Sequence, residues 1–268
     1  MLFLYSAGCG RWPSTPTPLD LPLQERKETT ITCKLTEAPR YMDIPVFDSS
    51  MRGKAVTGTY HYKLWLPKGY LADPEQRWPC LFIASAQGDA SMGNMATWLM
   101  SNDYVVVMLV ESKNGPWEPI IGNFLAAHDD VVRRVRVQEG QKIATGQSGG
   151  ARASSVFVQI RPGFSGLILQ GAGAAYDAGG EHYCLTGIQT NPALNVAMTM
   201  GSDDSNRREV AEMRAALDVS RFLVLHFNGG HTWAPPQVFQ QAIEWIEHRI
   251  HTERPPAAEA GEPVRETK

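Results

Sequence analysis

The sequence has few cysteines: four in 268 residues, at Cys9, Cys33, Cys80 and Cys184. No two of them have the CxxC spacing of zinc or redox motifs, and four are too few to form a disulfide framework in a chain of this length. Cys80 lies inside an apolar run, so we expect it to be a small core residue. The cysteines therefore predict no structural zinc, no redox-active dithiol and no disulfide scaffold.

An excess of positive charge and a long apolar run are also missing. The 25 lysines and arginines are outnumbered by 28 aspartates and glutamates, which gives a formal net charge of −3. Without a basic excess or a polybasic run, the chain is not expected to bind nucleic acid. The longest strongly apolar run, 104–110, is much shorter than the ~20 residues of a membrane-spanning helix. There is no HExxH motif either, and we expect neither a metal nor a cofactor.

What the sequence does have is the composition of an ordinary globular protein, with 43% hydrophobic and 20% charged residues. Its length is compatible with one large domain or two small ones. Residues 1–25 begin with a short apolar stretch that ends in Cys9 and is similar to the end of a bacterial lipoprotein signal, and a proline-rich tether follows. Residues 252–268 are typical of a solvated tail. This leaves 26–251 as a single domain, and it leaves an exported or lipid-anchored protein and a cytoplasmic one as open alternatives.

From residue 58 onward, strand-like runs alternate with helix-like runs. Several of the strand-like runs are apolar throughout, as in strands covered on both faces, and the helix-like runs carry apolar residues at helical spacing. The expected strands are 59–66, 80–85, 104–110, 141–146, 166–170, 195–200 and 222–227, and the expected helices are 92–102, 119–138, 149–160, 206–217 and 236–250. The polar, glycine-rich segment 171–194 is expected to be an insertion over the site. The alternation predicts a three-layer α/β fold with a mostly parallel sheet, whose functional residues follow the strands.

A candidate nucleophile stands directly after the expected strand 141–146. The residues from Gly146 to Gly150 read Gly-Gln-Ser-Gly-Gly, a Gly-x-Ser-x-Gly pattern that precedes an expected helix. On a sharp turn from strand to helix, the Ser148 hydroxyl would project at the edge of the sheet, and the glycines would let neighbouring backbone approach. Outside this context the pattern would indicate only a glycine-rich turn with a capping serine.

A serine hydroxyl needs a base to take its proton, and a histidine that follows a strand is the best candidate. His231 lies in Asn-Gly-Gly-His-Thr-Trp, between the last expected strand and the last expected helix. A carboxylate should then orient the histidine. Asp203 and Asp204 both follow the expected strand 195–200, and either could do so while the other caps the next helix.

In this order of serine, acid and histidine, the sequence resembles the α/β-hydrolase superfamily over most of residues 58–250. The segment 146–150 looks like the nucleophile elbow, 201–204 like the acid loop, and 229–233 like the histidine loop. The last is most similar to esterases of the polyhydroxybutyrate depolymerase and feruloyl esterase kind, and to dienelactone-hydrolase-like proteins. In that pattern the acid stands three residues after the glycine, and the resemblance therefore selects Asp204 over Asp203.

The resemblance also implies an oxyanion hole built from two backbone N–H groups. One should belong to Gly149, the residue after the nucleophile, and the other to the loop after strand 80–85. There the family commonly has His-Gly, whereas this chain has Ser-Ala-Gln-Gly at 85–88, in which Gln87 aligns as the donor.

The function expected from these residues is that of a serine hydrolase that cleaves small-molecule carboxylic esters through an acyl-enzyme. A serine peptidase or amidase with the same three residues, and a binding module that keeps the fold without catalysis, are the alternatives. Trp117, Trp233 and Glu111 could line a substrate pocket, although core or surface packing would equally explain them. The sequence leaves the substrate and the oligomeric state open.

Overall fold

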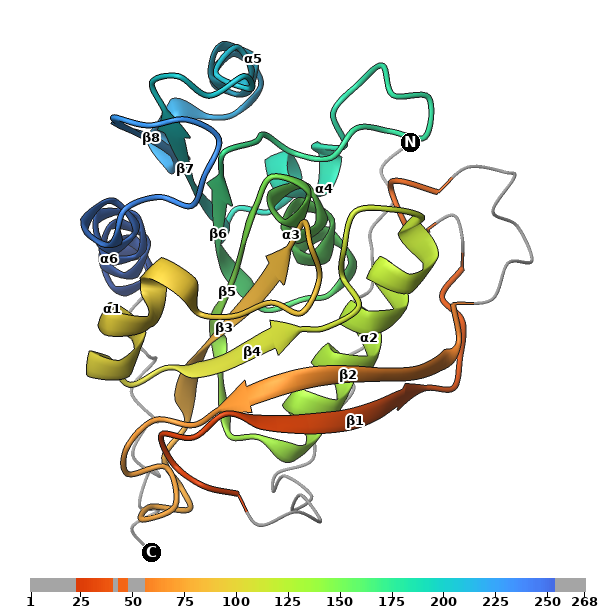
Figure 1. Cartoon of the computed structure of the whole chain (residues 1–268), viewed down its shortest axis with the longest axis vertical. Coiled ribbons are helices and arrows are strands. Elements are labelled where there is room, and N and C mark those ends of the chain that lie inside the picture. The colour runs from red at the N-terminus through yellow and green to blue at the C-terminus, as the bar shows by residue number, and fades with distance from the viewer. Residues whose placement is uncertain (1–22, 41–42, 48–55, 254–268) are drawn as a thin grey trace, which may run out of the picture.

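The computed structural model describes residues 23–40, 43–47 and 56–253 (Figure 1). The signal-like segment with Cys9 and nearly all of the expected tail lie outside the described residues. Residues 23–25 lie against the domain: Leu23 packs on the core, and the Glu25 carboxylate accepts hydrogen bonds from the backbone N–H groups of Gly69 and Leu71. No helix in the described part of the chain is long and apolar enough to cross a membrane.

The described residues form eight strands, and helices lie between them from the third strand onward. The strands are β1 (Thr29–Leu35), β2 (Gly58–Trp65), β3 (Trp78–Ser85), β4 (Val105–Leu109), β5 (Val137–Gln147), β6 (Phe164–Gln170), β7 (Asn195–Gly201) and β8 (Phe222–Phe227). The α-helices are α1 (Ala96–Ser101), α2 (Trp117–Arg134), α3 (Gly149–Ile160), α4 (Thr186–Thr190), α5 (Glu209–Ala216) and α6 (Pro236–Glu253), and two 3₁₀ turns, η3 (Gly93–Met95) and η4 (Val219–Arg221), precede α1 and β8.

The strands form one sheet in the order β1-β2-β4-β3-β5-β6-β7-β8. β1 pairs with β2 and β2 with β4 in antiparallel fashion, and all the other pairs are parallel. The expected mostly parallel sheet is confirmed, with two additions. β1 was not predicted from the sequence, and β5 begins at Val137, where the sequence had suggested that the preceding helix still continued.

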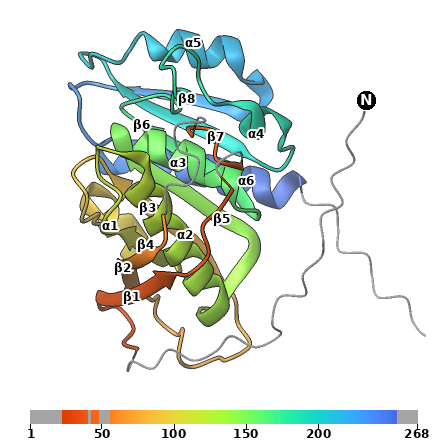
Figure 2. The same cartoon turned by 90° about the vertical axis from the view of Figure 1, so that its right-hand side faces the viewer.

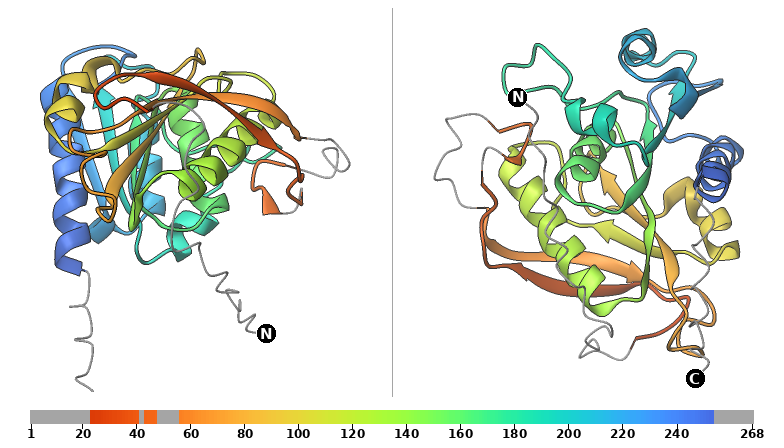
Figure 3. Two further views of the ribbon diagram at one scale, coloured as in Figure 1. Left: turned by 90° about the horizontal axis from the view of Figure 1, so that it is seen from below. Right: turned by 180° about the vertical axis from the view of Figure 1, so that it is seen from behind.

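Helices cover both faces of the sheet. α2 and α3 pack on one face and α1 and α6 on the other (Figure 2; Figure 3, left). Each face has its own apolar cluster, and the larger one lies under α2 and α3. In it the rings of Phe124 and Phe157 stack with centroids 4.0 Å apart, which joins the two helices. Complete burial of one such side chain contributes about 1.5–3 kcal/mol, so this layer fixes α3 firmly on β5.

The register of the parallel strands aligns their carboxyl ends. Ser85 at the end of β3 pairs with Gln147 at the end of β5, and Gln147 pairs with Gln170 at the end of β6. The loops that follow these strands therefore leave the sheet side by side. The segment 171–194 was expected to be too polar for the core, but its first part is not, because Ala172, Ala174 and Ala175 are fully buried.

Candidate active site

The turn between β5 and α3 holds Ser148 in a conformation that side-chain-bearing residues rarely adopt. Its backbone angles are φ 57° and ψ −119°, and its N–H donates to the Gln170 carbonyl oxygen at 2.9 Å. Holding a residue in such a backbone conformation costs about 1–3 kcal/mol of folding free energy, and the conformation is kept only where the surrounding structure enforces it. Here the enforcement comes from close packing: a Cβ atom on Gly146 would lie 2.3 Å from the Gly150 carbonyl carbon, and one on Gly150 would lie 2.3 Å from the Ala84 carbonyl oxygen.

His231 lies between the serine and a buried carboxylate. Its Nε2 is 2.8 Å from Ser148 Oγ, and its Nδ1 is 3.0 Å from both carboxylate oxygens of Asp204. With the Nδ1 proton directed at the carboxylate, Nε2 carries the lone pair that accepts the serine hydroxyl proton. The His231 side chain is 36% exposed, whereas Asp204 is fully buried. The structure thus joins the three residues from the three motifs in one hydrogen-bonded chain.

Of the two neighbouring aspartates, Asp204 is the one that reaches the histidine. Its Oδ1 also accepts the backbone N–H of Asn206 at 2.8 Å, and the Asn206 side chain donates to the Gly171 carbonyl oxygen at 2.9 Å. Asp203 is exposed, and its carboxylate accepts a hydrogen bond from Ser202 Oγ at 3.3 Å. The geometry therefore favours Asp204, as the resemblance did.

Two contacts fasten the histidine loop to the sheet. A Cβ atom on Gly201, the last residue of β7, would lie 2.4 Å from the Gly229 carbonyl oxygen, so the loop runs directly over the end of that strand. On the other side, the fully buried Gln170 accepts the Ala234 N–H at 3.2 Å and donates to Thr145 Oγ1 at 3.0 Å. The loop is held from β7 and from β6, which fixes the position of the imidazole.

The two expected oxyanion donors differ in their surroundings. Gly149 is the first residue of α3, where an N–H has no acceptor inside the helix and the helix dipole favours negative charge. The Gln87 N–H donates to Ser85 Oγ at 3.2 Å. The role of oxyanion donor stays a prediction for both Gly149 and Gln87.

The three residues suggested as pocket lining each have packing or hydrogen-bond partners. Trp117, at the start of α2, is partly buried against the larger core cluster, and Trp233 against the smaller one. Glu111 accepts two hydrogen bonds from His61, from Nδ1 at 2.7 Å and from the backbone N–H at 3.0 Å. A role in substrate contact stays a prediction for all three.

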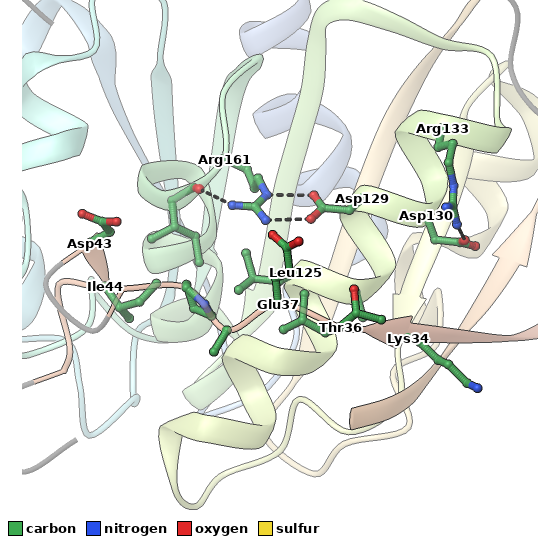
Figure 4. Close-up of a pocket in the computed structure, with 15 residues that line it drawn as sticks. Lys34, Thr36, Glu37, Asp43, Ile44, Leu125, Asp129, Asp130, Arg133 and Arg161 are labelled. Atoms are coloured by element: carbon green, nitrogen blue, oxygen red, sulfur yellow. Dashed lines mark hydrogen bonds and ion pairs between the residues drawn. The ribbon is translucent and has the colours of Figure 1, made fainter. Parts of the chain in front are cut away.

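A cavity of about 580 Å³ lies elsewhere, among residues from the loop after β1, from α2 and from the end of α3 (Figure 4). In it Arg161 binds both carboxylate oxygens of Asp129, at 2.8 and 2.7 Å. Arg161 follows the last residue of α3, whereas Ser148 precedes the first, so the length of the helix, roughly 18 Å, separates the cavity from the serine. Among the described residues no group of three or more His, Cys, Asp or Glu side chains is placed to hold a metal ion.

Two supporting residues of the site were missed from the sequence. Asn206 follows Asp204 by two positions, a spacing typical of turns in which an aspartate accepts a nearby backbone N–H, so its role could have been found. Gln170 gave a weaker signal, a polar residue at the end of an otherwise apolar strand. Its partner Ala234 is 64 residues away, and nothing in the local pattern indicates that pairing.

No family model and no curated protein matches the sequence. Solved structures do match the fold. S-formylglutathione hydrolase from Staphylococcus aureus aligns with a TM-score of 0.56 at 12% identity, over 82% of this chain and 99% of its own. The feruloyl esterase module from Clostridium thermocellum aligns with a TM-score of 0.55 at 12% identity, over 85% of this chain and 92% of its own. Dipeptidyl peptidase 4 from Porphyromonas gingivalis has a TM-score of 0.54 at 13% identity, over 84% of this chain but 36% of its own. Together with the strand order, these likenesses show that the chain has the α/β-hydrolase fold that its motifs had suggested.

Proposed function

We propose that the protein is a serine hydrolase that cleaves small-molecule carboxylic esters through an acyl-enzyme. The observation that carries the proposal is the hydrogen-bonded chain from Ser148 through His231 to Asp204, with the serine on a strained turn before a helix. Burial of Asp204 keeps this carboxylate away from water, so it can stabilise the imidazolium ion that forms when His231 takes a proton.

The reaction would proceed in two stages, formation of the acyl-enzyme and its hydrolysis. Ser148 Oγ attacks the ester carbonyl carbon as its proton passes to His231 Nε2, and the electron pair of the carbonyl bond moves to the oxygen. Collapse of this intermediate expels the alcohol, which takes the proton from His231. A water molecule then attacks the carbonyl carbon of the acyl-enzyme, and His231 first accepts a proton from the water and then donates it to Ser148 Oγ as the acid leaves. The N–H groups of Gly149 and Gln87 would stabilise the oxyanion in both halves.

Ester cleavage is favoured over the two alternatives by separate observations. The dipeptidyl peptidase among the similar structures is matched over 36% of its length, whereas the S-formylglutathione hydrolase and the feruloyl esterase module are matched over 99% and 92% of theirs. A binding module would have no need of a serine held at a positive φ within 2.8 Å of a histidine whose other nitrogen faces a buried carboxylate.

A fluorophosphonate probe tests the nucleophile directly. The wild-type protein should be labelled and should hydrolyse short-chain nitrophenyl esters, while Ser148→Ala should do neither. Labelling of Ser148→Ala as strong as that of wild type would refute the assignment of the nucleophile. A wild-type protein that is neither labelled nor active across acyl lengths would favour the binding module, and faster cleavage of nitroanilides than of the matching esters would favour the amidase.

A further inference from the structure

The side chain of Asn114, in the loop between β4 and α2, lies against the residue that follows the nucleophile. A Cβ atom built on Gly149 would be 1.7 Å from Asn114 Oδ1 and 3.3 Å from Nδ2. A residue with a side chain cannot fit at position 149 unless Asn114 moves. The carboxamide of Asn114 therefore stands beside the Cα atom of Gly149, the residue whose N–H is expected to bind the oxyanion.

The backbone of Asn114 is held in place by the loop after β3. Its N–H donates to the Ala86 carbonyl oxygen at 2.8 Å, and the adjacent Lys113 forms an antiparallel bridge with Gln87. The two loops are so close at Gly88 that a Cβ atom there would be 3.0 Å from Lys113 Cβ. Because the backbone is pinned in this way, rotation of the Asn114 side chain is the main freedom left at this position.

The oxyanion hole needs donors that point at the developing charge. In the described structure the backbone N–H of Gln87 donates to Ser85 Oγ, so this group would have to leave that acceptor before it could serve the oxyanion. A carboxamide carries two N–H donors at one end, and rotation by 180° about the Cβ–Cγ bond of Asn114 exchanges its NH₂ group with Oδ1. After this rotation Nδ2 occupies the position beside Gly149.

We propose that Asn114 is a further catalytic residue, whose Nδ2–H donates a hydrogen bond to the oxyanion together with the N–H of Gly149. The inference rests on the proposed serine hydrolase function and deepens it. Asn114 moves no proton and no electron pair. It stabilises the negative charge that reaches the carbonyl oxygen when Ser148 attacks.

The test uses Asn114→Ala, which removes the donor, and Asn114→Asp, which keeps the shape but replaces the NH₂ group with a carboxylate oxygen. With nitrophenyl acetate, kcat should fall about 10²- to 10³-fold in Asn114→Ala and at least as far in Asn114→Asp, while KM stays within threefold. Asn191→Ala, at a half-buried asparagine before β7, should keep the wild-type kcat.

A second measurement separates an oxyanion donor from a structural residue. A trifluoromethyl ketone forms a tetrahedral oxyanion on the nucleophile, so its inhibition constant should rise by the same factor by which kcat/KM falls in each Asn114 variant. Because Asn114 is exposed, the thermal unfolding midpoint should not change. A kcat within threefold of wild type, or a fall in kcat with unchanged inhibitor affinity, would overturn the role of Asn114 and leave the serine hydrolase standing. An inert wild-type protein would instead overturn the proposed function.

Discussion

Gly201 and Gly229 are in contact: a Cβ atom on the first would lie 2.4 Å from the carbonyl oxygen of the second. Gly201 ends β7 three residues before Asp204, and Gly229 begins the turn that carries His231. The acid loop and the histidine loop can approach one another only because residue 201 has no side chain. This contact places the carboxylate under the imidazole.

The substitution Gly201→Ala should therefore separate the acid from the base. The new methyl group would push the histidine loop away from β7, and we expect kcat/KM for nitrophenyl acetate to fall about 10²-fold, the loss that a displacement of about 1 Å can cause. The control is Gly58→Ala, since a Cβ atom there makes only ordinary contacts of 3.6 Å or more. Equal activity of both variants would mean that the loop accommodates the methyl group without moving His231.

The identity of the acid can be decided by comparing two amide variants. Asp204→Asn should lower kcat by about 10⁴-fold, because an amide cannot stabilise the imidazolium and favours the wrong tautomer. Asp203→Asn should stay within a few fold of wild type, since this exposed carboxylate does not contact His231. Steady-state kinetics on nitrophenyl acetate measure both, and a larger fall for Asp203→Asn would reverse the assignment.

Gln170→Leu tests the contact that ties the histidine loop to β6. The substitution leaves the Ala234 N–H without its acceptor and Thr145 Oγ1 without its donor, in a place with no access to water. We expect a loss of about 1–3 kcal/mol in the free energy of unfolding, measured by urea denaturation. The exposed Gln189, which donates one hydrogen bond to the Ala216 carbonyl oxygen, offers Gln189→Leu as a control with a much smaller loss. A similar loss in both variants would show that burial of the Gln170 amide does not increase its contribution to the free energy of unfolding.

Far from the triad, a buried lysine predicts a pH-dependent stability. Lys142 Nζ is 2.7 Å from His128 Nε2, and burial lowers the pKa of Lys142 from 10.5 to about 8. Below pH 8 the folded protein bears the full cost of a buried ammonium ion. Between pH 8 and 10.5 the folded amine is neutral while the unfolded one is still protonated, so this group's contribution to stability rises with pH.

Lys142→Met isolates that contribution, because the other titrating groups are common to both proteins. The stability of the variant relative to wild type should be highest below pH 8 and should decline by up to about 3 kcal/mol toward pH 10.5. Urea denaturation at pH 7, 8, 9 and 10 measures the difference. Lys34→Met, which removes an exposed lysine on β1, is the control for the loss of a lysine that is not buried. A constant difference for Lys142→Met would contradict the lowered pKa.

Elements that carry a strong local signal were predicted well. α3 runs over 149–160 as expected, because the turn at Ser148 fixes its start and its apolar stripe fixes its face. β1 was missed because it is an edge strand in which only Ile31, Cys33 and Leu35 are buried, a pattern too short to stand out. α2 ends at Arg134, earlier than expected, because Val135 is already extended and the chain turns toward β5.

For the site, the sequence indicated residues that follow strands, and the structure brings Ser148, Asp204 and His231 together. The sequence did not indicate Gln170 or Asn114, because their partners belong to other strands and loops. The contact of Asn114 with Gly149 depends on how the loops after β3 and β4 stack, and that follows from the strand order. Spacing along the chain carries no information about such contacts.

The strand order also separates the residues for proton transfer from most of the groups for oxyanion stabilisation in the proposed reaction. Proton transfer would depend on the loops after β5, β7 and β8, whereas the oxyanion would be held by the Gly149 N–H after β5 together with groups from the loops after β3 and β4. In the strand order β3 and β4 lie on one side of β5, and β7 and β8 lie on the other. Substitutions in the loops after β3 and β4 would therefore change the stabilisation of the oxyanion while Ser148, His231 and Asp204 keep their geometry. Oxyanion binding and proton transfer could then diverge independently.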